Sequence, residues 1–112
     1  MKIPMNDLEG HVVEFLRKVA ETMPTSLHKW IAGAMIASSA TRIQEMLGTF
    51  ADNDGMVDID SLRKIVDEGF SASGGELVVP IGGNSVPVFN LEPVKVRITK
   101  ADADGLFASI GA

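Results

Sequence analysis

A stretch without charged side chains limits the folds that this chain can adopt. Residues 30–41, between Lys29 and Arg42, contain no Asp, Glu, Lys or Arg and fall inside a predicted helix over 26–48. Apolar residues occupy two faces of that helix, whereas a helix with one face in water has a single apolar stripe. The helix is therefore either the central helix of the domain or a surface shared with a second subunit.

Small side chains fill most of the same stretch. Eight of the twelve residues from Trp30 to Thr41 are Gly, Ala, Ser or Thr, so another backbone could approach the helix closely. Trp30, at the start of the stretch, is of a residue type enriched in interface cores. The interface residues that the sequence predicts are Trp30, Gly33, Ala34, Ala37 and Ala40.

One further helix is predicted before the 26–48 helix and another after it, with a turn-rich segment preceding the second. Apolar residues recur at helical spacing over 6–22, and Asn6 followed by Glu9 resembles a capping box at the start of that helix. The segment 51–55 contains Asp, Asn and Gly residues that favour turns. Helical spacing returns over 59–70.

After the glycine pair at 74–75, the spacing of the apolar residues changes from the helical period of 3.6 to the strand period of 2. Alternating apolar residues predict strands over 77–81, 86–91 and 94–98, with a hairpin turn over 82–85. Thr99 and Asp102 then form a second capping-box pattern, which predicts a short last helix. The expected fold is a single α+β domain over 1–112, with three N-terminal helices, an antiparallel three-stranded meander and a short C-terminal helix.

Charge and composition argue against several classes of function. Ten Lys and Arg against fifteen Asp and Glu give a net charge of −5, without the basic stripe that binds a phosphate backbone. We therefore expect no nucleic-acid partner. The uncharged stretch is shorter than the roughly 20 apolar residues that span a bilayer, so no membrane partner is expected. The first residues lack a signal-peptide pattern, and the chain is expected to be cytoplasmic.

An aspartate cluster between two predicted helices resembles a calcium-binding EF-hand loop. Such a loop needs oxygen ligands at positions 1, 3, 5, 7 and 9, glycine at 6 and a bidentate Glu at 12. With Gly55 at position 6, Phe50 falls on position 1 and Ser61 on position 12, and both lack the required carboxylate. The residues that would bind calcium are Asp52, Asp54, Asp58 and Asp60. The alternative is that they form a turn and cap the following helix.

The sequence offers little for catalysis. The two histidines, His11 and His28, have no partner at catalytic or ligand spacing, and acid–base chemistry needs a positioned partner. No phosphate-binding loop or nucleophile elbow is present, so no cofactor is expected. The chain is expected not to be an enzyme, although a pocket assembled from distant segments is not visible in one sequence.

Four short segments resemble a group of bacterial proteins. They are GMVDIDSL at 55–62, SASGG at 71–75, ELVVPI at 76–81 and ITKADADGLFASI at 98–110. In this combination they resemble small uncharacterised proteins encoded in prophage-like regions of gut bacteria. That resemblance implies no activity and carries over no functional residue.

The sequence therefore favours a non-enzymatic interaction or assembly protein. Its partner would be another protein or a second copy of the chain, bound through the 26–48 helix. The alternative is a degenerate EF-hand-like module centred on 52–60.

A calcium titration separates these two hypotheses. We expect no binding heat at micromolar affinity, because two of the ligand positions of the loop lack carboxylates. A saturable isotherm for the purified protein would contradict the interpretation of the aspartates as turn and cap residues.

Overall fold

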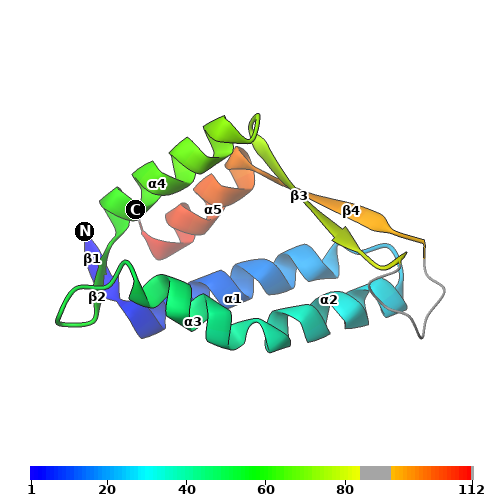
Figure 1. The fold of residues 1–112 in the computed structure, drawn as a ribbon, viewed down its shortest axis with the longest axis horizontal. Coiled ribbons are helices and arrows are strands. Elements are labelled where there is room, and N and C mark those ends of the chain that lie inside the picture. Colours follow the sequence, from blue (N-terminus) through cyan, green and yellow to red (C-terminus); the bar gives the residue numbers. More distant parts are fainter. Residues whose placement is uncertain (84–91, 112) are drawn as a thin grey trace.

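The computed structural model describes residues 1–83 and 92–111 (Figure 1). Five helices and four strands follow one another in these residues: β1 (Lys2–Pro4), α1 (Met5–Glu21), α2 (Ser26–Ser38), α3 (Ala40–Gly48), β2 (Met56–Asp58), α4 (Ile59–Ala72), β3 (Glu76–Ile81), β4 (Val94–Thr99) and α5 (Lys100–Ile110). The α+β class expected from the sequence is confirmed.

The elements form an elongated and open arrangement (Figure 1). Helices α1, α2 and α3 lie along one side, α4 and α5 stand together at one end, and the β3–β4 ribbon leads from these two helices towards the N-terminal end of α2. The molecule measures 46 × 28 × 21 Å, with a radius of gyration of 15.1 Å. A compact domain of this length has a radius of about 13 Å. The chain is therefore less compact than its length predicts.

Helix α1 contributes to two separate hydrophobic cores. Its first turns place Leu8 in a core with Ile43, Leu47, Val57, Ile59 and Phe107, which we call the first core. Its last turns place Ala20 in a second core with Met23, Ile31, Ala32, Ile81 and Val96. A helix of this length spans about 25 Å, enough for its two ends to pack in different cores. The apolar stripe predicted over 6–22 is confirmed as the side that packs.

Arg63 links α4 to α5 at the first core. Its guanidinium lies 3.4 Å from Asp104 Oδ1 and stacks over the Phe107 ring at 5.6 Å from the ring centre. The ion pair is partly exposed, so it contributes roughly 0–1 kcal/mol. The guanidinium lies over the Phe107 ring, where a cation–π contact adds on the order of 0.5–1 kcal/mol at an exposed site.

The helix predicted over 26–48 is broken at Ser39, which corrects the single rod expected from the sequence. The Ser38 hydroxyl donates to the carbonyl of Met35, and the Ser39 amide donates to the carbonyls of Met35 and Ile36. The Ser38–Met35 and Ser39–Ile36 bonds each span three residues, as in a 3₁₀ turn, and they tighten the last turn of α2. The break lets α2 pack in the second core and α3 in the first.

The three-stranded meander is also wrong. β3 pairs directly with β4 in antiparallel register, matching Leu77 with Ile98, Val79 with Val96 and Ile81 with Val94. A meander would put the strand predicted over 86–91 between them, and that strand lies outside the described residues. The other two-stranded sheet pairs β1 with β2, and no pattern in the sequence predicted either of these short strands.

Helix starts were predicted with mixed success. α1 begins at Met5 after Pro4, with no side-chain cap, so the capping box predicted at Asn6 and Glu9 is wrong. The capping box of Thr99 and Asp102 at the start of α5 is confirmed in both directions.

A buried histidine connects α2 to the residues just before β4. His28 is 5% exposed, and its Nδ1 lies 2.6 Å from the hydroxyl of Thr25, the N-cap of α2. Its Nε2 lies 3.1 Å from the backbone carbonyl of Glu92. The ring thus satisfies both of its nitrogens while joining segments that are far apart in the sequence.

Replacing this histidine tests its structural role. We expect His28→Ala to lower the free energy of unfolding by about 1–3 kcal/mol, because it removes a buried side chain together with its hydrogen bonds to Thr25 and to the Glu92 carbonyl. Lys29→Ala, at the exposed neighbouring position, should change it by less than about 0.5 kcal/mol. Urea denaturation of the two variants and the parent chain measures the difference, and equal effects would contradict the role.

Candidate interaction surface

The outward face of α2 carries most of the interface residues predicted from the sequence. Trp30 is 62% exposed, Gly33, Ala34 and Ala37 are exposed, and Ala40 at the start of α3 is half-buried. The opposite face buries His28, Ile31 and Ala32. The helix is thus covered on one side only, and we call the set Trp30, Gly33, Ala34, Ala37 and Ala40 the α2 face.

Three residues of the α2 face line a shallow groove against α1. Gly33, Ala37 and Ala40 form one wall, and the other includes Arg17 and Glu21 of α1; the groove holds about 340 Å³. A Cβ added at Gly33 would meet no heavy atom within 4 Å. Trp30 and Ala34 lie on the same side of the helix, outside the groove lining. The small side chains therefore leave room for another backbone.

Sequence reasoning missed a second apolar surface, on the inner side of the molecule. Met46 is 53% exposed, Ile65 is 48% exposed and Leu77 is 44% exposed, and all three line one cavity of about 340 Å³. We call it the central cavity. Its walls come from α1, α3, α4, β3, β4 and α5 together with Phe50.

A smaller cavity adjoins the central one. It holds about 180 Å³ and lies between α1, α2 and the β3–β4 pair, with Met35 and Val79 in its lining. We call it the ribbon cavity. Leu16 and Ile98 line both cavities, which places the two spaces side by side. No local pattern could have revealed them, because their walls are assembled from elements distant in sequence.

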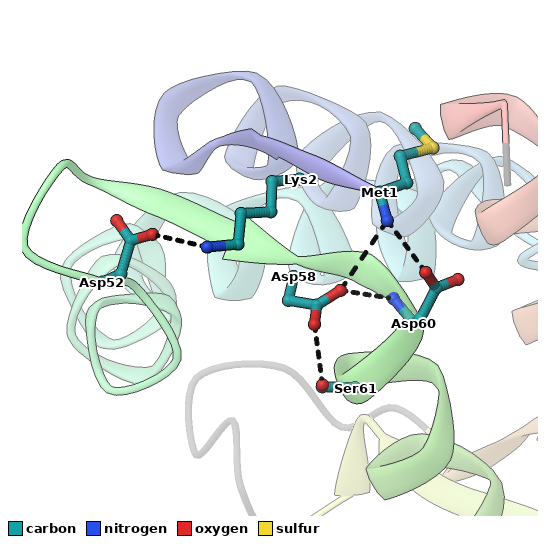
Figure 2. A network of polar contacts seen from close by, with 6 residues as sticks. All are labelled: Met1, Lys2, Asp52, Asp58, Asp60 and Ser61. Carbon is teal, nitrogen blue, oxygen red and sulfur yellow. Dashed lines mark hydrogen bonds and ion pairs between the residues drawn. The ribbon is translucent and has the colours of Figure 1, made fainter.

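The aspartates of the EF-hand-like segment hold the loop and the helix start through bonds within the chain (Figure 2). Asp52 Oδ1 accepts from the amides of Asp54 and Met56 at 2.9 and 3.0 Å, while its Oδ2 lies 3.2 Å from Lys2 Nζ. Gly55 takes a φ of 74°, which the turn requires. This is the geometry of a side-chain-supported turn.

Asp58 and Asp60 lie at the start of α4. Asp58 is its N-cap and accepts from the amide of Asp60 and from the hydroxyl of Ser61. Asp60 accepts from the Met1 amino group at 2.8 Å (Figure 2). The described residues contain no group of three or more His, Cys, Asp or Glu side chains placed to hold a metal ion.

Hydrogen bonds to the charged form lower the pKa of two of these carboxyls. The pKa of Asp58 lies below its ordinary value, chiefly because Ser61 donates to it, with desolvation acting in the opposite direction. The Met56 amide has the same main effect on the pKa of Asp52. Both side chains are thereby stabilised as carboxylates in the folded state.

The two histidines lie in different surroundings. His28 is buried in the contacts with Thr25 and Glu92 described above. His11 lines a groove between α1 and α5 together with Glu14 and Asp102. The hydroxyl beside His28 is that of Thr25, which caps the start of α2 by accepting from the His28 amide.

Comparisons with protein-family models, curated proteins and solved structures find no match to this chain. The resemblance to prophage-encoded proteins therefore stays a prediction. Among the helices in the described part of the chain, none is long and apolar enough to cross a membrane.

The lowered pKa of Asp58 predicts how its contribution to stability depends on pH. The contribution is fully present above the ordinary value of 3.8 and is lost as the pH falls through the lowered folded value. Asp58→Asn should therefore be less stable than the parent chain at neutral pH, and the difference should shrink in acid. Denaturation series from neutral to acidic pH measure this, with Asp54→Asn as the control of equal charge change. A difference that persists unchanged in acid would contradict the electrostatic explanation.

Proposed function

We propose that the protein is a non-enzymatic assembly protein that associates with a second copy of itself through the α2 face. The observation that carries the proposal is the exposure of an uncharged helix face with Trp30 at 62% and small residues beside it. Aromatic side chains are enriched, and charged ones depleted, at the centres of protein interfaces.

Charge favours a second copy of the chain as the partner of the α2 face, with the two α2 faces in contact. The chain carries a net charge of −5, so two copies repel each other over most of their surfaces. Residues 30–41 carry no charge, and the groove beside them holds one cation and one anion, Arg17 and Glu21 of α1, so self-contact there brings little net charge together. A two-fold axis would place the same patch on both copies, which suits a face of small residues around one tryptophan.

Other parts of the expected function remain predictions. A different protein could use the same face, and association would then need that partner. The absence of enzymatic activity and the cytoplasmic location are likewise expectations from the sequence.

A pair of matched glycine substitutions tests the self-association. Gly33→Glu puts a charged side chain on the α2 face, whereas Gly10→Glu makes the same change on α1, among charged residues. A Cβ at either position meets no heavy atom within 4 Å, so both variants are expected to fold. We expect the dimer to weaken by at least about tenfold in Gly33→Glu, as a buried unpaired charge is costly, and to persist in Gly10→Glu.

Sedimentation velocity over a range of micromolar concentrations measures the association, and circular dichroism verifies the folding of both variants. A parent chain that stays monomeric at every concentration would contradict self-association. Equal weakening by the two substitutions would place the interface elsewhere.

A further inference from the structure

The exposed apolar side chains are concentrated around the two inner cavities. Nine large apolar side chains are exposed among the described residues. Six of them line the central or the ribbon cavity: Met35, Met46, Phe50, Ile65, Leu77 and Val79. Single exposed apolar residues are normal on protein surfaces, but a cluster around a cavity marks a binding site.

The lining chemistry selects an apolar ligand. Every described side chain that lines the central cavity is apolar, and Ser39 is the one polar residue in the lining of the ribbon cavity. A polar ligand would lose its hydrogen bonds to water and find few replacements here. An engineered apolar cavity of about 150 Å³ stays dry and binds benzene. The central cavity, at about 340 Å³, is larger than that.

The two cavities adjoin and form one apolar space with two compartments. A hydrocarbon chain is narrow enough to occupy the central cavity and to continue past Leu16 and Ile98 into the 180 Å³ of the ribbon cavity. The shape and lining together fit a thin, flexible and apolar molecule.

We propose that the two cavities form one binding site for a single unbranched hydrocarbon chain, such as the acyl chain of a fatty acid. The chain lies between α1, the α4–α5 pair and the β3–β4 pair, and its polar head stays in water beside Ile65 and Leu77. The site is separate from the α2 face and does not depend on self-association.

Titration calorimetry with dodecanoate, below the concentration at which it forms micelles, tests the site. We expect saturable binding of one dodecanoate per chain and weaker binding of octanoate, because less apolar surface is buried. Dodecanol should also bind, since no ionisable side chain among the described residues lines either cavity. Gly33→Glu should bind dodecanoate like the parent chain, which separates this proposal from the proposed self-association.

Two valine substitutions form a matched pair. Val66 is partly buried and lines the central cavity, so Val66→Phe fills space that the ligand needs. Val78 is 45% exposed, lies outside both linings and is paired with Arg97 in the sheet, so Val78→Phe leaves the cavities unchanged. We expect Val66→Phe to weaken dodecanoate binding on the order of tenfold or more and Val78→Phe to leave it unchanged.

Two substitutions at Ile65, at the mouth of the central cavity, test the proposal even if Val66→Phe fails to fold. Ile65 is 48% exposed, so a charged side chain there reaches water. Ile65→Glu should weaken dodecanoate binding relative to Ile65→Lys, because like charges repel at the mouth. The proposal is overturned by absence of saturable binding, by a stoichiometry well above one, by equal effects of the two valine variants, or by equal affinities of the two Ile65 variants.

Discussion

The fold depends on one side of α1 packing into two hydrophobic cores at once. Leu8 is 1% exposed in the first core, and Ala20 is 9% exposed in the second. The other helices and strands attach to one core or the other: α3, α4 and α5 to the first, α2 and the β3–β4 pair mainly to the second. Because α1 is the element they share, its length sets the distance between the cores. The elongated shape and the inner cavities both follow from that distance.

The break at Ser39 separates two helices that contribute side chains to different cores. α2 and α3 lie one after the other along α1, with Ile31 and Ala32 of α2 in the second core and Ile43 and Leu47 of α3 in the first (Figure 1). α2 then has two exposed apolar regions with different surroundings. Gly33 and Ala37 face outward beside the charged side chains of α1, and Met35 borders the ribbon cavity. The two proposals concern these two regions separately.

Local periodicity predicted the helices over 6–22 and 59–70, the strand 94–98 and the last helix, because each has one side that packs against a core. The strand 77–81 was also predicted from alternation, although Leu77 and Val79 on its apolar side are exposed and only Ile81 is buried. The break at Ser39 was not predicted, since serine and alanine continue a helical pattern. Direct pairing of β3 with β4 was missed because strand order is not encoded in alternation. Trp30 and Gly33 are exposed on α2, and their role as interface residues stays a prediction. The cavities depend on contacts between distant segments and left no sequence pattern.

The composition of the first core determines when the chain can become stable during synthesis. Leu8 lies near one end of the sequence and Phe107 near the other, yet both are at most 2% exposed in the same cluster. The cluster cannot close until α5 has left the ribosome, so the apolar sides of α1, α3 and α4 stay accessible to chaperones and proteases until then. A nascent chain that stops before α5 would therefore present a degradation signal rather than a partly working protein.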